Sequence, residues 1–115
     1  MDGRIQRTVF EWVAAWAGAP YVDMITEAGP DGILARREPV EPYRGMHARL
    51  GIAVNVHGAK RVVVVGHEDC AGNPVDKAAH FEHIREGVRV VKQWYPDVEA
   101  AGIYVSLDGR VERVV

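Results

Sequence analysis

The chain has 115 residues, of which 48% are apolar and 26% are charged, a composition close to that of ordinary globular proteins. This length predicts a single domain over residues 1–115. Fourteen basic and sixteen acidic side chains give a net charge of −2, which argues against nucleic-acid or anionic-membrane partners. No apolar run approaches the ~20 residues of a membrane span. The single cysteine, Cys70, excludes an intramolecular disulfide and favours a reducing, cytoplasmic setting.

The first quarter of the chain predicts a helix and then a strand. Apolar residues recur at steps of three and four over residues 4–17, which indicates an amphipathic helix. Gly18 and Pro20 end it. Residues 21–26 (YVDMIT) are rich in β-prone side chains and predict a short strand, which the turn-rich residues 28–32 close.

The middle of the chain predicts two further helices around a buried strand. Residues 33–44 carry two prolines and predict a short helical turn followed by a loop. Helical spacing returns over residues 46–57, up to Gly58. Residues 61–67 (RVVVVGH) form an apolar run without alternation, which is typical of a parallel strand covered on both faces. Residues 81–95 then keep helical spacing.

Two short strands are expected at the end of the chain. Residues 103–105 are β-prone, and Asp108-Gly109 is a hairpin signal that leads into a last strand over residues 111–115. Because helices and strands alternate, the expected fold class is α/β. We expect a mostly parallel central sheet flanked by helices, with a short C-terminal hairpin.

The loop after the most apolar strand is the expected place for chemistry, since α/β sheets bind ligands beyond the carboxyl ends of their strands. Residues 66–74 (GHEDCAGNP) lie there and carry His67 and Cys70. An imidazole nitrogen and a thiolate at this spacing can bind one zinc ion. The same spacing also suits a turn in which the histidine bonds the backbone and the cysteine packs as a small hydrophobe. Spacing alone leaves both interpretations open.

Three segments together resemble the β-class carbonic anhydrases. Residues 50–72 (LGIAVNVHGAKRVVVVGHEDCAG) resemble the family's helix, strand and ligand loop. Residues 101–114 (AGIYVSLDGRVERV) resemble its closing hairpin, and residues 1–4 (MDGR) resemble its C-x-D-x-R motif from the second position onward. In that motif, the first zinc cysteine and the strand before it would fall directly before Met1.

This resemblance implies a β-carbonic-anhydrase-like fold and zinc-dependent hydration of carbon dioxide to bicarbonate. His67 and Cys70 would be zinc ligands, and the cysteine before Met1 would be the third. Asp2, paired with Arg4, would orient the attacking water; in closed family sites the aspartate itself takes the fourth zinc position. The resemblance also implies a homodimer or a higher homo-oligomer.

Two hypotheses account for the absent cysteine. Either Met1 is an internal methionine of a longer product, preceded by an apolar strand that ends in cysteine, or the chain is a shortened relative with an incomplete site. The positions of Asp2 and Arg4 favour the first. The alternative function is a non-catalytic α/β dimer of the same fold that binds an anion or a metal; another small heterocumulene, such as carbon disulfide, is a third possibility. With two ligands, residues 1–115 are expected to bind zinc weakly or not at all.

The remaining polar candidates receive structural interpretations. Asp23 is expected to pair locally, although it could replace the absent thiolate as an oxygen ligand. His57 is expected on the apolar face of the second helix, in the core or in an interface, while His80 and His83 are expected at the surface. The two acids between His67 and Cys70 are expected to be solvated or to contact the ligands. For Asp2 and Arg4, a solvated N-terminus with a helix cap is the alternative.

Overall fold

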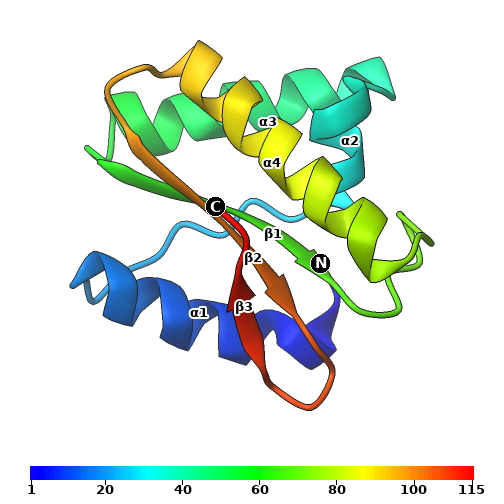
Figure 1. Ribbon diagram of the computed structural model, residues 1–115. Helices are drawn as coiled ribbons and strands as arrows, with labels where there is room; N and C mark the ends of the chain where they lie inside the picture. The colour runs from blue at the N-terminus through cyan, green and yellow to red at the C-terminus, as the bar shows by residue number, and fades with distance from the viewer.

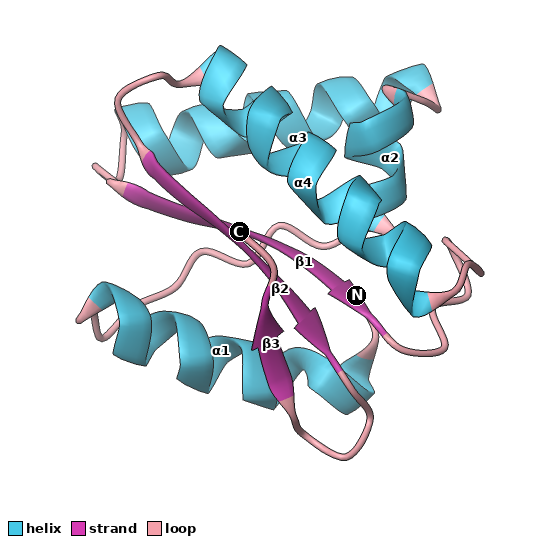
Figure 2. Cartoon of the chain, viewed as in Figure 1, coloured by secondary structure: helices cyan, strands magenta, loops and turns pink.

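The computed structural model describes residues 1–115 and has three layers (Figure 1). Helix α1 lies on one side of a central sheet, and α2, α3 and α4 lie on the other (Figure 2). The elements are α1 (Gly3–Ala17), α2 (Pro30–Arg36), α3 (Val40–Asn55), β1 (Arg61–His67), α4 (Lys77–Trp94), β2 (Glu99–Val105) and β3 (Val111–Arg113). The expected α/β class is confirmed. No helix is both long enough and apolar enough to cross a membrane.

The sheet has three strands in the order β1–β2–β3 and is only partly parallel. β1 and β2 run parallel, in register from Arg61 opposite Glu99 to His67 opposite Val105. β3 returns antiparallel to β2 after a turn that contains Gly109, whose φ of 90° favours glycine. The predicted C-terminal hairpin is therefore present, although its last strand is shorter than the sequence indicated.

Both faces of β1 are covered, as its unalternating run of valines predicts. Val64 faces the larger core cluster, which α2, α3 and α4 complete. Val63 and Val65 face the opposite way, against Ile5 and Val9 of α1. Each of the four valines therefore packs on one of two apolar layers, which is why the run shows no alternation with polar residues.

The predicted helix over residues 4–17 is confirmed as α1. The Asp2 carboxylate accepts a hydrogen bond from the Arg4 backbone N–H at 2.9 Å and caps its start. Gly18 ends the helix in the left-handed conformation, with a φ of 61°. The cap fixes residues 1–4 at the start of α1, on the face of the sheet that α1 covers.

Two predictions of local structure are wrong. Residues 21–26 are extended but form no strand, because no neighbouring strand pairs with them, and Tyr21 is 88% exposed. α3 begins at Val40, inside the predicted loop. Pro42 is tolerated there because the first turn of a helix has no backbone acceptor for its missing N–H. α3 ends at Asn55, so His57 lies beyond it.

Candidate functional site

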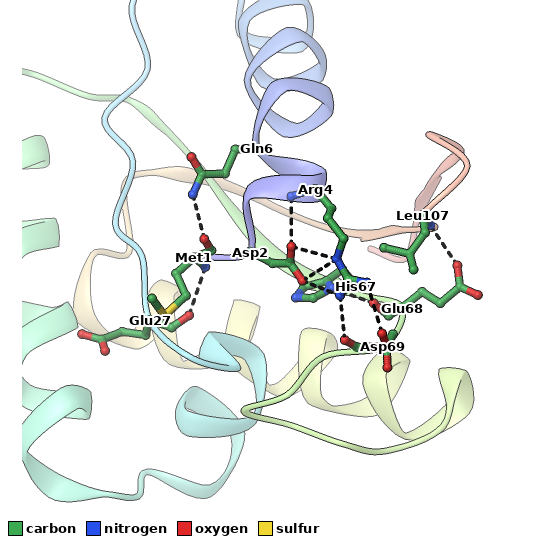
Figure 3. A network of polar contacts seen from close by, with 9 residues as sticks. All are labelled: Met1, Asp2, Arg4, Gln6, Glu27, His67, Glu68, Asp69 and Leu107. Carbon is green, nitrogen blue, oxygen red and sulfur yellow. Dashed lines mark hydrogen bonds and ion pairs between the residues drawn. The ribbon is translucent and has the colours of Figure 1, made fainter.

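The candidate site lies where β1 ends and α1 begins. Figure 3 shows Asp2, Arg4 and His67 close together, the first two from the start of α1 and the last from the end of β1. The Arg4 guanidinium reaches across to the loop after β1, donating to a carboxylate oxygen and to the carbonyl oxygen of Asp69, each at 3.2 Å. The structure therefore brings three of the four predicted site residues together, and Cys70 follows directly after Asp69 in the same loop.

Asp2 and Arg4 form a tight pair. Arg4 Nη2 lies 2.6 Å from Asp2 Oδ2, and Arg4 Nε lies 3.1 Å from both carboxylate oxygens. The side-chain hydrogen bonds from Arg4 hold the pKa of Asp2 well below its usual range, with a smaller contribution from the nearby His67. The same pair raises the pKa of Arg4. The pair with Arg4 therefore favours the ionised form of the Asp2 carboxylate.

The N-terminus is tied to the body of the protein. The amino group of Met1 donates to the Glu27 carbonyl oxygen at 3.1 Å, and the Gln6 side-chain amide donates to the Met1 carbonyl oxygen at 2.9 Å (Figure 3). Asp2 both caps α1 and pairs with Arg4, so the capping role and the paired geometry coexist.

His67 has the hydrogen-bonding pattern of a metal ligand. Its side chain is buried, and Nδ1 lies 2.8 Å from the carbonyl oxygen of Glu68. A carbonyl oxygen only accepts hydrogen bonds, so in the neutral ring Nδ1 carries the hydrogen and Nε2 keeps its lone pair. Metal-binding histidines are commonly oriented by such a bond from the other ring nitrogen.

The two acids after His67 are exposed to solvent, as expected, and each also makes a contact outside its own loop. Glu68 accepts a hydrogen bond from the Leu107 N–H at 2.8 Å, which ties the loop to the β2–β3 turn. Asp69 is held by Arg4 and adopts a positive φ of 55°. Cys70, the free thiol, is buried. The two acids thus fix the loop between the candidate ligands.

His67 and Cys70 supply two of the three protein ligands that a catalytic zinc normally takes. No three His, Cys, Asp or Glu side chains are grouped so that they could hold a metal ion. Asp23, the possible replacement, lies 2.6 Å from His57, which precedes the amino end of β1 and so lies far from His67. Asp23 is therefore paired, as expected, although its partner lies 34 positions away in the sequence. His57 was expected in the core or in an interface; the core position is wrong, because its side chain is 57% exposed, and the interface stays a prediction.

A buried polar network lies beneath the site, and the sequence analysis missed it. Asp31 Oδ2 lies 2.6 Å from His80 Nδ1, and both side chains are essentially inaccessible to solvent. Asn73 donates to the same Asp31 oxygen at 3.1 Å and lies 2.9 Å from His83 Nδ1. The surface position expected for His80 is therefore wrong. A signal was available, since His80 falls four residues before Ile84 on the buried face of α4.

This network holds the ligand loop from the side opposite Arg4. Asn73 lies in the loop after Cys70, and its N–H donates to the Cys70 carbonyl oxygen at 3.3 Å. A Cβ at Gly66, just before His67, would come within 2.9 Å of Asp31 Oδ2, so the strand end fits closely over the pair. The loop carrying Cys70 is thus fixed by α1 on one side and by α2 and α4 on the other.

Comparison with known families decides the relationship of the chain. A family model described as "Putative carbonic anhydrase" matches residues 1–115. The chain belongs to this family. A search of curated proteins finds no match. The resemblance in the ligand loop, the closing hairpin and the first four residues is thereby confirmed at the level of the carbonic anhydrase family, which implies a small-molecule substrate.

The buried pair in this carbonic anhydrase family member is expected to dominate stability near the site. Asp31→Ala leaves His80 without its buried partner and should lower the free energy of unfolding by about 3–5 kcal/mol. The matched control is Asp23→Ala, which removes an Asp–His contact of the same 2.6 Å length at the surface and should cost about 0–1 kcal/mol. Urea unfolding followed by circular dichroism measures both. Equal losses of unfolding free energy in the two variants would show that the buried Asp31–His80 pair stabilises the fold no more than the exposed Asp23–His57 pair.

Proposed function

We propose that this chain provides most of a zinc site for the hydration of carbon dioxide to bicarbonate, a site completed by a third protein ligand beside His67. The observation that carries the proposal is the position of the Asp2–Arg4 pair against the end of β1, next to a histidine whose Nε2 is free to bind a metal. The proposal includes a β-carbonic-anhydrase-like fold, a homodimer or higher homo-oligomer and a cytoplasmic setting. The family and the single cysteine support these parts of the proposal.

His67 Nε2 and Cys70 Sγ are the donors that would hold the metal. Zinc, when bound, supplies the chemistry that makes hydroxide available at neutral pH. The neutral imidazole is kept in the required tautomer by the Glu68 carbonyl oxygen. The buried position of both donors limits their contact with solvent water.

The Asp2 carboxylate acts as a fixed hydrogen-bond acceptor. Three contacts from the Arg4 side chain leave it little freedom to rotate. A carboxylate whose pKa is held far below neutral takes up a proton poorly, so Asp2 orients an approaching hydroxyl group and does not act as a general base. Arg4 is held in turn by Asp69, which couples this orientation to the position of the ligand loop.

Restoring a thiol next to Met1 tests the proposal directly. A chain with one cysteine inserted between a new initiator methionine and Met1 should bind about one zinc per chain, the number expected for three protein ligands and one open position, and should hydrate carbon dioxide. Elemental analysis measures the zinc content, and stopped-flow assays with a pH indicator measure the rate of hydration. The matched control carries serine at the inserted position and should neither bind zinc nor hydrate carbon dioxide.

Variants of the cysteine-extended chain test the two proposed ligands. His67→Ala and Cys70→Ser should lose zinc, whereas His57→Ala should keep it. Zinc binding without hydration would favour the non-catalytic alternative, and no zinc in any chain would contradict the proposed site.

The role of Asp2 can be separated from its role as a helix cap. Asn caps helices as well as Asp does, so Asp2→Asn in the cysteine-extended chain should keep the fold and the zinc. It should lower kcat about a hundredfold, the loss expected when reacting groups are displaced by about 1 Å. An unchanged kcat would exclude the proposed orienting role. Asp108→Asn, in the hairpin turn away from the site, is the control and should leave kcat unchanged.

A further inference from the structure

The side-chain amide of Asn73 has only one orientation that suits its neighbours. Its Nδ2 lies 3.1 Å from Asp31 Oδ2, an oxygen that as part of a carboxylate only accepts hydrogen bonds. Its Oδ1 lies 3.4 Å from Arg36 Nη1, which only donates. Exchanging the amide oxygen and nitrogen would set two acceptors against each other at Asp31 and two donors at Arg36. Charges on both sides therefore fix the amide with Nδ2 towards Asp31.

Close packing prevents this amide from turning away. Asn73 is 1% exposed, and the start of α2 covers it. A Cβ at Gly32 would lie 2.7 Å from Asn73 Cγ, and a Cβ at Gly29 would lie 2.7 Å from Asn73 Cβ. No real Cβ atom approaches so closely, so the two glycines make the space that the side chain fills. The amide can change its contacts only if the loop that carries it moves.

The fixed amide determines the hydrogen position on His83. Asn73 Nδ2 lies 2.9 Å from His83 Nδ1. Because an amide nitrogen only donates, His83 Nδ1 must be the acceptor and carries no hydrogen. His83 is therefore neutral in this contact, with its hydrogen on Nε2. A proton added to Nδ1 would set two donors against each other.

The charged groups on the elements packed against α4 offer no substitute acceptor. In α2, Asp31 Oδ2 already accepts from Asn73 and lies 2.6 Å from His80 Nδ1, and Arg36 is a cation. Between Arg61 and His67, β1 carries no ionisable side chain. In β2, the ring of Tyr104 lies 5.7 Å from the ring of His80. A protonated His83 would therefore find no new partner on these elements.

The acids of α4 next to His83 are already paired. Glu82 accepts from Arg85, and Glu86 accepts from Arg89 and from Arg37 at the end of α2. The arginine contacts hold the pKa of Glu86 below its usual range. These carboxylates are thus engaged elsewhere when His83 takes up a proton.

The same asparagine holds the ligand loop. The Asn73 N–H donates to the Cys70 carbonyl oxygen at 3.3 Å, and the Val75 N–H donates to the Asn73 carbonyl oxygen at 2.8 Å. Gly72, the residue before it, packs so closely on Ala28 that a Cβ there would lie 2.3 Å from the Ala28 carbonyl carbon. A displacement of the Asn73 side chain would therefore also displace the turn that follows Cys70.

We propose that Asn73 is a positioning residue for Cys70 and that the charge of His83 controls how firmly it holds the loop. With His83 neutral, the amide makes all three of its side-chain contacts. With His83 protonated, one contact becomes a repulsion between donors and the loop loosens. Histidine side chains generally change charge between about pH 5 and 8. The role of Cys70 as a ligand rests on the proposed function, whereas the coupling of His83 to the loop does not.

The Tm at two pH values, about 7.5 and about 5.5, tests the coupling. The folded state resists a proton that the unfolded chain accepts, so this contribution to stability is lost as the pH falls. His83→Gln offers an oxygen that accepts from Asn73 and takes up no proton. Its Tm should lie within about 2 °C of that of the 115-residue chain at the higher pH and about 4 °C above it at the lower pH.

The matched control for this substitution is His57→Gln. Protonation of His57 strengthens its contact with the Asp23 carboxylate, so removing it should give no gain in Tm at the lower pH. An equal gain in the two variants, or no gain for His83→Gln, would overturn the coupling.

Asn73→Asp should reverse the pH dependence. The new carboxylate faces Asp31 and accepts from a protonated His83, so acid should now favour the folded state. Relative to the 115-residue chain, the Tm of this variant should rise by at least about 4 °C between the higher and the lower pH. Asn55→Asp, at the exposed end of α3, keeps its charge at both pH values and should show one constant difference. Equal behaviour of the two variants would contradict the fixed orientation of the Asn73 amide.

The thiol of Cys70 reports the loop itself. It is buried and is the only thiol of the chain, so its rate of reaction with a pyridyl disulfide measures local opening. At the lower pH the 115-residue chain should react about fivefold faster than His83→Gln, the factor expected for one lost hydrogen bond. At the higher pH the two rates should be equal. Equal rates at both pH values would overturn the positioning role of Asn73.

These measurements need no metal, so they are independent of the proposed zinc site. If the cysteine-extended chain binds no zinc, the proposed function fails while the Tm and thiol results still support the coupling. If the cysteine-extended chain binds zinc but His83→Gln matches the 115-residue chain in Tm and thiol rate at both pH values, the coupling fails and the proposed function stands.

Discussion

The parallel ladder between β1 and β2 fixes the position of His67 and of the ligand loop that follows it. It holds β1 in register from Arg61 to His67 and so delivers the histidine to the edge of the sheet where the loop begins. It also determines which backbone N–H and C=O groups of β1 are hydrogen-bonded to β2 and which remain unpaired. The site at the end of β1 and the unpaired edge along its side are two consequences of the same pairing.

Contacts to the helices on both sides of the sheet hold the ligand loop in place. Arg4 draws it towards α1 through Asp69, and Asn73 draws it towards α2 and α4 through Asp31. The two contacts act from opposite faces of the sheet, and one of them is fully buried. Such preorganisation lowers the entropic cost of bringing donors together when a metal binds.

The sequence predicted those parts of the fold that depend on local pattern. The helix over residues 4–17, the valine strand and the hairpin each have a periodicity or a turn signal of their own. Residues 21–26 have strand composition, but a strand also needs a neighbour, and this chain places none beside them. The start of α3 was hidden by Pro39 and Pro42, which the helix accommodates at its first turn.

The site was predictable in its residue types but not in its connections. His67 and Cys70 stand out because the loop after a buried strand is a common ligand position, and family resemblance singled out Asp2 and Arg4. The contact between Arg4 and Asp69 joins residues 65 positions apart, which no local pattern reports. The burial of His80 was visible in the spacing of α4, yet its partner Asp31 lies 49 positions away.

The unpaired edge of β1 is the central claim of this account, and residue-resolved amide hydrogen exchange of the 115-residue chain tests it most directly. The N–H groups of Val62 and Val64 point to β2 and should be strongly protected. Those of Val63 and Val65 face the unpaired edge of β1, since successive residues of a parallel ladder alternate in direction. They should exchange at least about a hundredfold faster, because only local opening separates them from water. Equal protection of all four amides would contradict the account, since it would require another strand to be paired there already.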